Sequence, residues 1–418
     1  MDENWVRQVL ATALGDEPPI GPVARNSLRA GIRLRRRVRM RRAAGGAAAV
    51  AVAAAVIPAA HGVFGHTAAG PRTAAPFSAP KVPAVPTGTA YVITSGAGIV
   101  TPIDLATNTA AQPIDVSGEP VAMAVTPDGK TAYVASGAAN SGREPTSAQT
   151  VTPIDLTTNT AGKPIIFPNP VDAIAITPDG KTGYVINGFP SRTVTRVNLA
   201  TDKPGKQVTL SAPPYEIAMA PDGKTAYLIT AVGTSNAGRP GNLYYFARFD
   251  LATSKLGKRL ELSGQPASMA IARNGKTAYL VSQSSSTVVT VTPIDLRTLR
   301  TEKAINIITK PLPTKGYIGR PLAIAIAPDG MTAYVADGAS STVTPVDLAT
   351  GALGKPISLT GKIGSDAIAI SSNGAAAYVA NQPSSTVTPI NLATDTAESP
   401  IKIGSGWDSG FEAIVTVP

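Results

Sequence analysis

The stretch TPDGKTAYV, residues 126–134, decides the fold because close copies of it recur along the chain. The copies are TPDGKTGYV (177–185), APDGKTAYL (220–228), ARNGKTAYL (272–280), APDGMTAYV (327–335) and SSNGAAAYV (371–379). A seventh, shortened copy is TGTAYV (87–92). The tyrosines of the seven copies, from Tyr91 to Tyr378, are spaced by 42, 51, 43, 52, 55 and 44 residues. This period is typical of one four-stranded propeller blade per unit.

Each unit predicts four short strands. The first is a small-residue run such as AIAI, and the Pro-Asp-Gly-Lys turn that follows reverses the chain, because Gly accepts a left-handed conformation there. The second strand is TAYV and the third is TVTPIDL. Proline in the third strand removes one donor, which is tolerated only at an edge or bulge. A short fourth strand follows a turn of the ATN type. The tyrosines and the Asp residues of PIDL are expected to serve the scaffold.

The two ends of the repeat region complement each other. The first unit lacks a first strand, and the last residues, FEAIVTVP (411–418), match a first strand and little else. We therefore expect Glu412–Val417 to pair with Thr89–Thr94 and to close a ring, which removes the unpaired sheet edges. The sequence thus predicts an all-β, seven-bladed β-propeller over residues 88–418.

The first 87 residues predict three further segments. Residues 1–42 are short and basic, with nine arginines between Arg25 and Arg42. Residues 43–64 are uncharged and long enough for one transmembrane signal-anchor helix. Residues 65–87 are a Pro/Ala-rich linker. Arginines before an apolar span favour a cytoplasmic N-terminus, so we expect a single-pass cell-membrane protein whose propeller is extracytoplasmic. A cleaved signal peptide is the rival interpretation.

Charge and composition exclude several classes of function. The formal net charge is +10, but residues 1–87 hold 12 Lys+Arg and 4 Asp+Glu, which leaves 25 and 23 for the rest. The propeller therefore has no general electrostatic reason to bind nucleic acid. The chain has no Cys, and its two histidines, His61 and His66, precede the repeats. The repeats can supply neither thiolate nor imidazole for catalysis.

The units YVASG…TVTPIDLATNTAGKPI resemble the YVTN-type β-propeller repeats of bacterial envelope and archaeal surface-layer proteins. The likeness covers about four-fifths of the chain. It implies a propeller of the kind shared by binding modules, lactonase-like enzymes and domains of quinoprotein and copper enzymes. The resemblance therefore implies a fold and leaves the activity open.

Two groups of residues are candidates for a site. The first group lies around the starts of the first strands at one channel mouth, with Tyr215 nearby: Glu119, Asp172, Glu216, Arg320, Asp366 and Glu412. The second lies in or beside the variable loops 138–149, 231–242, 308–321 and 404–411, which the predicted meander gathers on one face: Arg143, Arg239, Tyr317, Trp407 and Phe411. The acids suit a Ca²⁺ ion or a cationic ligand, or else form a solvated ring.

We expect a non-catalytic binding module at the cell envelope, monomeric, without a cofactor, and with an envelope protein or glycan as partner. A lactonase-like or other hydrolase using the channel-mouth acids is the alternative. A third is a signalling protein in which the segment Trp5–Leu14 reports binding to the cytoplasm.

Overall fold

The computed structural model describes residues 88–137, 149–187, 191–236, 239–264, 266–285, 287–309, 322–360, 365–381, 384–403 and 411–417, all within one compact unit of the chain. The side chains of 233–242, 365–366 and 411–412 are also outside the description. The segments expected at 1–42, 43–64 and 65–87 lie outside the described residues.

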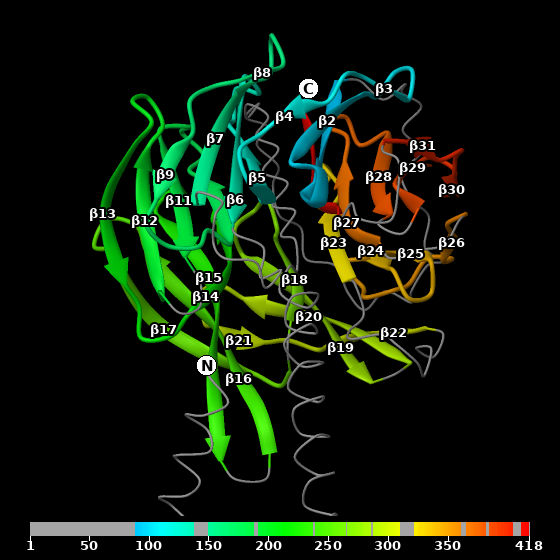
Figure 1. Cartoon of the computed structure of the whole chain (residues 1–418). Helices are drawn as coiled ribbons and strands as arrows, with labels where there is room; N and C mark the ends of the chain where they lie inside the picture. Colours follow the sequence, from blue (N-terminus) through cyan, green and yellow to red (C-terminus); the bar gives the residue numbers. More distant parts are fainter. Residues whose placement is uncertain are drawn as a thin grey trace, which may run out of the picture. The chain divides into compact units, whose positions relative to one another are not determined.

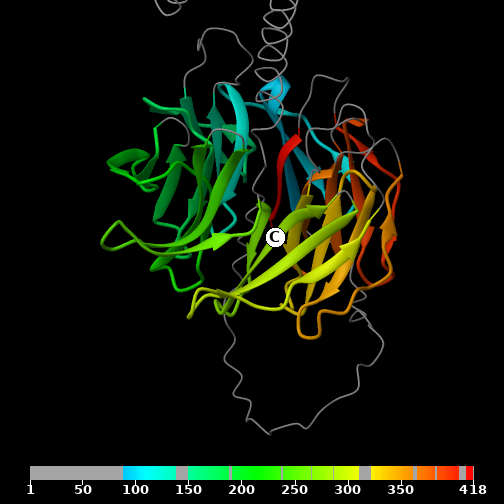
Figure 2. The same ribbon diagram turned by 90° about the horizontal axis from the view of Figure 1, so that it is seen from below.

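Seven antiparallel sheets surround a common axis (Figures 1 and 2). Each has one innermost strand, and in ring order these are β32 (Phe411–Val417), β5 (Glu119–Val125), β10 (Ala173–Ile176), β14 (Pro214–Met219), β18 (Pro266–Ile271), β23 (Leu322–Ile326) and β27 (Ser365–Ile370). Every innermost strand contacts the next, and β27 contacts β32. The prediction of an all-β, seven-bladed propeller is therefore confirmed, and we number blades one to seven in this order.

The second and third strands of the blades follow the predicted meander. The second strands are β1 (Thr89–Thr94), β6 (Thr131–Gly137), β11 (Thr182–Asn187), β15 (Thr225–Asn236), β19 (Thr277–Ser285), β24 (Thr332–Asp337) and β28 (Ala376–Asn381). The third strands are β2 (Ile99–Asp104), β7 (Gln149–Asp155), β12 (Thr193–Asn198), β16 (Arg239–Asp250), β20 (Val288–Asp295), β25 (Thr342–Asp347) and β29 (Thr386–Asn391). One 3-10 turn, η1 (Ser95–Ala97), joins β1 to β2.

The outermost strands differ between blades. They are β3 (Thr109–Ala110), β4 (Ile114–Asp115), β8 (Thr160–Ala161), β9 (Ile165–Phe167), β13 (Lys203–Thr209), β17 (Lys255–Leu262), β21 (Arg300–Thr301), β22 (Ile305–Ile308), β26 (Ile357–Ser358), β30 (Thr396–Ala397) and β31 (Ile401–Lys402). Only blades three and four carry one long outer strand among the described residues, β13 and β17.

Proline in the third strand explains this difference. Five blades place Pro opposite the repeat tyrosine, and the carbonyl of Pro102, for example, accepts from Ala111 at 2.8 Å on the outer side. The missing N–H of that proline faces the same way, so the ladder to the fourth strand breaks there. Blades three and four have Arg196 and Arg248 at this position, and their outer strands continue through a bulge.

The C-terminal strand closes the ring as expected. β32 pairs antiparallel with β1, with Thr89 opposite Val417 and Thr94 opposite Phe411, and with a register shift after Val92. Figure 2 shows this red strand beside the blue start of the propeller. Blade one is therefore built from both ends of the repeat region.

Candidate functional site

Blade four departs from the repeat at its innermost strand. On each innermost strand, one residue lies opposite the repeat tyrosine of the second strand. Two positions before that residue, five blades carry a buried alanine: Ala122, Ala173, Ala323, Ala367 and Ala413. Blade four has Glu216 there, and blade five has Ser268. Both side chains are buried, and Glu216 is only 1% exposed. Where the repeat needs a small residue, blade four thus places an ionisable one.

Both polar side chains contact the innermost strand of the next blade. The amide of Met269 on β18 donates a hydrogen bond to the Glu216 carboxyl group. The amide of Ile324 on β23 donates to Ser268 Oγ at 3.4 Å, at the equivalent register position. A backbone donor at the inner edge of a sheet has no strand to pair with. Glu216 and Ser268 therefore satisfy edge donors of their neighbours.

Burial raises the pKa of Glu216 to about 8, and the Met269 amide opposes part of that rise. The charged form is disfavoured because the group has left water. Its Oε1 and the neighbouring Tyr215 Oη, both buried, have no hydrogen-bond partner among the described residues. Burial and the nearby Glu216 also raise the pKa of Tyr215. Because the pKa of Glu216 is about 8, its carboxyl group is mostly protonated at neutral pH.

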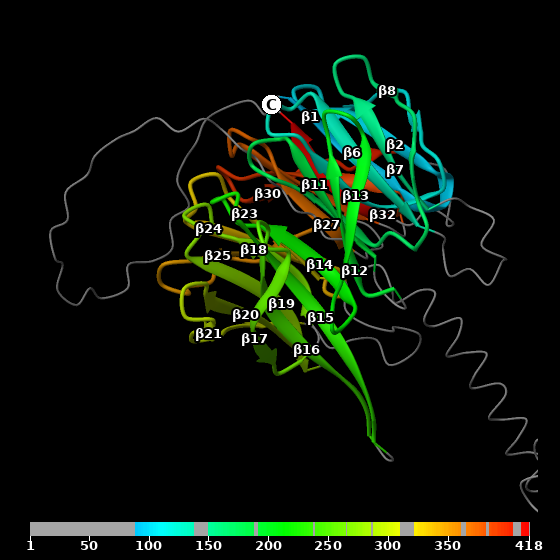
Figure 3. The same cartoon turned by 90° about the vertical axis from the view of Figure 1, so that its left-hand side faces the viewer.

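A long β-ribbon rises from the same blade. In β15 and β16 six residue pairs, from Ala231–Tyr244 to Asn236–Arg239, lie beyond the length of an ordinary blade hairpin. At the strand rise of antiparallel sheets this adds about 20 Å. Figures 1 and 3 show the ribbon projecting from the propeller. The expectation of a loop was wrong for residues 231–236 and 239–242, because the hydrogen-bonded ladder of β15 and β16 continues through them.

Aromatic contacts hold the base of the ribbon. The Tyr215 and Tyr244 rings meet edge to face, with centroids 5.9 Å apart. The Arg259 guanidinium of β17 lies 4.6 Å from the Tyr245 ring centroid. Beyond Ala231 and Tyr244, the strands β14 and β17 no longer pair with the ribbon. Its two edges therefore leave backbone donors and acceptors unpaired by the described strands.

A second departure lies at the junction of blades four and five. The turn after each third strand has a residue at positive φ. At five of the seven junctions, the repeat tyrosine of the preceding blade donates its hydroxyl to that turn. The bonds run from Tyr91 to Asn159 (2.8 Å), Tyr133 to Asp202 (2.9 Å), Tyr378 to Asn108 (3.2 Å), Tyr334 to Asp395 (3.5 Å) and Tyr184 to the Leu251 carbonyl (3.5 Å). At the position of the Asn or Asp, blade four has Ser254, blade six has Gly351, and blade five has Leu299 (φ 52°). A leucine cannot accept, so this hydrogen bond to the side chain is lost for Tyr227.

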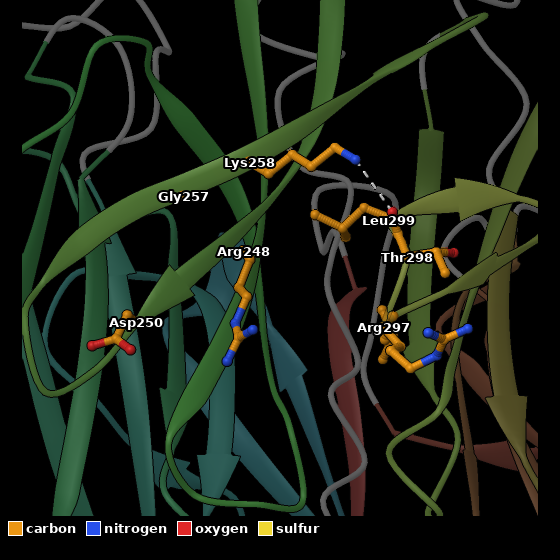
Figure 4. A pocket seen from close by; sticks show the side chains of 8 residues that line it. Arg248, Asp250, Gly257, Lys258, Arg297, Thr298 and Leu299 are labelled. Carbon is orange, nitrogen blue, oxygen red and sulfur yellow. Dashed lines mark hydrogen bonds between the residues drawn. The ribbon is translucent and has the colours of Figure 1, made fainter.

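A hollow of about 360 Å³ lies at this junction, lined by Arg248, Asp250, Gly257, Lys258, Leu296, Arg297, Thr298 and Leu299. In Figure 4, Lys258 reaches from β17 towards the blade-five turn, where its Nζ donates to the Thr298 carbonyl at 3.4 Å. Arg248 donates to Thr225 Oγ1 at 3.3 Å. The hollow belongs to the face of the third-strand turns, whereas the ribbon tip belongs to the opposite face.

The predicted channel-mouth acids occupy different environments where the structure describes them. Glu119 is half-buried at the start of β5, and Asp172 is exposed just before β10. Glu216 lies one register position further along its strand than Asp172 does, and it is buried. Arg320 lies outside the described residues. Asp366 and Glu412 fall within β27 and β32, but their side chains are outside the description. The convergence of these acids on one mouth stays a prediction.

The predicted partner contacts fall almost entirely outside the description. Arg143, Tyr317 and Trp407 are not among the described residues. Arg239 and Phe411 begin β16 and β32, without described side chains. Sequence reasoning missed Arg248, Lys258 and Leu299. Two of them carried a readable signal, because Arg248 replaces the repeat proline and Leu299 replaces an Asn or Asp.

The described residues include no group of three or more His, Cys, Asp or Glu placed to hold a metal ion. They also include no helix of the length and apolarity that a membrane crossing requires. The expectations of a Ca²⁺ site and of a membrane anchor at 43–64 stay predictions.

No known protein family matches the chain, and no curated protein is similar in sequence. Many solved structures are similar in fold. Hydrazine synthase of Kuenenia stuttgartiensis shares 20% identity at a TM-score of 0.57, covering 74% of this chain and 97% of that one. The Cps50 (Swd1) β-propeller domain of Myceliophteria thermophila shares 12% at 0.51, with 69% and 88% covered. The dihydro-heme d1 dehydrogenase NirN shares 14% at 0.53, with 81% and 77% covered.

These likenesses define the class of the protein, a seven-bladed β-propeller. The names of the similar structures include two enzymes and one propeller domain without a named reaction. At such low identity they establish the fold alone, so activity has to be argued from the residues of this chain.

Proposed function

We propose that this protein is a non-catalytic binding module of the YVTN-repeat kind, held at the cell membrane by residues 43–64 with its propeller extracytoplasmic. The 1–42 segment is then cytoplasmic and 65–87 is the spacer. The observation that carries the binding role is the β15–β16 ribbon. It extends one blade by about 20 Å on the face where the variable loops are expected.

The ribbon suits a protein partner better than a glycan. Its edges beyond Ala231 and Tyr244 offer backbone groups in extended conformation, and an extended segment of another protein can pair with them as an added strand. Leu243 adds an apolar side chain that is 37% exposed. The ribbon continues from a blade of the closed propeller, and the Tyr215–Tyr244 and Tyr245–Arg259 contacts hold its base. A preordered edge of this kind lowers the entropy cost of binding.

The test shortens the ribbon in the full-length chain. Residues 232–243 are replaced by Asn-Gly, which should give a tight hairpin at normal blade length. Partners are recovered from detergent-solubilised membranes of the native cells and quantified against wild type. We expect an unchanged melting temperature and roughly a tenfold or greater loss of one envelope protein. Equal recovery of every protein by both forms would count against the proposal.

The hydrolase alternative rests on the acids and has a separate test. Asp172 is exposed, and burial raises the pKa of Glu216 to about 8, as the general acid of such a pair would require. Glu216, however, is directed at the β18 backbone. Turnover of a lactone or glycoside panel that disappears in Asp172→Asn would favour the enzyme.

The signalling alternative concerns the cytoplasmic segment. Pull-down with residues 1–42 tests it, and a specific cytoplasmic partner would add a reporting role to the binding role.

A further inference from the structure

The hollow between blades four and five is lined on both sides by residues that depart from the repeat sequence. Arg248 replaces the proline that shortens the fourth strand in most blades, so β17 continues and carries Lys258 across the junction. Leu299 occupies the position at which four other blades have an Asn or Asp that accepts the tyrosine hydroxyl. Its side chain, with that of Leu296, is nearly buried. This junction therefore has a hollow lined partly by leucine, where five other junctions have a hydrogen bond from the repeat tyrosine.

The charge around the hollow is positive. Arg248, Lys258 and Arg297 are basic side chains, and all three are exposed. Against them stands Asp250, whose carboxylate accepts from the Thr253 amide at 2.7 Å and hydroxyl at 2.8 Å. Those bonds hold the pKa of Asp250 below its usual range and leave it less available to a ligand. Asp295, at the start of the turn, is bonded in the same way by the Arg297 and Thr298 amides.

The volume of the hollow and the chemistry of its lining limit the kinds of ligand that it could bind. A volume of about 360 Å³ is at the small end of ligand pockets. The described lining includes no aromatic ring, so nothing there would stack a nucleobase. Leucine side chains beside exposed cations suit a molecule with an aliphatic C–H face and one acidic group. We propose that this hollow binds an acidic carbohydrate residue, whose carboxylate or phosphate contacts Arg248 and Lys258.

Blade three supplies a matched control within the same chain. Arg196 and Lys206 repeat the positions of Arg248 and Lys258, in the motifs KPGK (203–206) and KLGK (255–258). The facing turn of blade four, however, has Ala252 and Ser254 where blade five has Arg297 and Leu299. Blade three thus has the equivalents of Arg248 and Lys258, but the turn that faces it has no equivalent of Arg297 or Leu299.

The experiment is isothermal titration of the full-length protein with glucuronate, glucose 1-phosphate, inorganic phosphate and neutral glucose. We expect binding of one or both sugar acids, weakened by salt because the contacts are between charges. The double variant Arg248→Ala/Lys258→Ala should lose about tenfold or more in affinity. The double variant Arg196→Ala/Lys206→Ala should bind as wild type does.

A second variant narrows the hollow without removing a charge. A Cβ at Gly257 meets the Arg248 carbonyl at 3.5 Å, which is an ordinary contact, so Gly257→Ala is accommodated and adds a methyl group to the lining. It too should weaken binding. Preference for glucuronate or for glucose 1-phosphate then identifies the acid group.

Three results would overturn the inference: no heat with either sugar acid, inorganic phosphate bound as tightly as glucose 1-phosphate, or equal losses in the blade-three control. The site does not depend on the ribbon, so the ribbon-shortened protein should bind the sugar acid with unchanged affinity. Failure of one proposal is thereby distinguishable from failure of the other.

Discussion

Glu216 shows what one substitution does within a strict repeat. The position it occupies is alanine in five blades because innermost strands approach each other near the axis. A glutamate there is tolerated because its carboxyl group accepts the amide of Met269 and is held protonated. A protonated acid avoids most of the cost of burying a charge. The one unpartnered oxygen, Oε1, remains a source of instability.

Replacing Glu216 with Gln should change how stability depends on pH. The folded pKa of about 8 exceeds the ordinary value of 4.5, so between these values only the folded state keeps the proton. Stability from this group is full below pH 4.5 and falls as pH rises to about 8, at up to about 1.4 kcal/mol per unit. Glutamine keeps the acceptor for Met269 and does not titrate.

Thermal unfolding from pH 5 to 9 measures this prediction. The melting temperature of Glu216→Gln should exceed that of wild type by a margin that grows with pH. A constant difference over the range would mean that Glu216 does not titrate there.

At the scale of the element, the blades are joined by the repeat tyrosine and the turn that follows the next third strand. Each tyrosine ring is buried between sheets, and five hydroxyl groups donate to the neighbouring blade. The turn residue sits at positive φ, where Asn, Asp and Gly are favoured. The same residue choice therefore makes the turn and accepts the tyrosine hydroxyl at four junctions. Ser254, Leu299 and Gly351 occupy the position at the other three junctions, and of these Leu299 is the bulky apolar one.

Tyrosine-to-phenylalanine variants should separate the two kinds of junction. Tyr133→Phe removes donations to Asp202 at 2.9 Å and Leu199 at 3.1 Å, and we expect a loss of about 1 kcal/mol in the free energy of unfolding. Tyr227→Phe should cost less, because its hydroxyl has no hydrogen bond within the described residues. Urea unfolding of both variants measures the difference, and equal losses would show that the hydroxyl bonds contribute nothing.

At the scale of the whole molecule, stability depends on a strand from the far end of the chain. Without β32, strand β1 would be an open edge and β5 and β27 would lose their common neighbour. Ala413 and Ile414 of β32 are both fully buried. Such an edge promotes aggregation.

Removal of residues 411–418 should therefore lower the melting temperature sharply or cause aggregation, as light scattering during a thermal melt would detect. Because the chain lacks Cys, the pair Thr89→Cys/Val417→Cys gives a clean complementary test. The oxidised pair should melt higher than the reduced pair. A truncated protein with the wild-type melt would contradict closure by β32.

The sequence by itself determined the blade count, the strand order, the tight turns and the closing pairing. All of these follow from a local pattern that repeats: PDGK turns, buried Tyr91 and its equivalents, and the missing strand supplied by 411–417. It also marked Pro102 and its equivalents as interruptions of a ladder. Local chemistry repeated seven times leaves little freedom in the fold.

Only the tertiary structure decided what blade four contributes. From sequence, Glu216 looked like one of a ring of acids, but its register places it one residue deeper, against the next blade. The segment 231–242 looked like a loop, but its residues 231–236 and 239–242 are paired strands. Leu299 is distant in the sequence from Arg248 and Lys258 and meets them at one junction. Burial and contacts between blades depend on how the sheets are arranged around the axis, which no single repeat encodes.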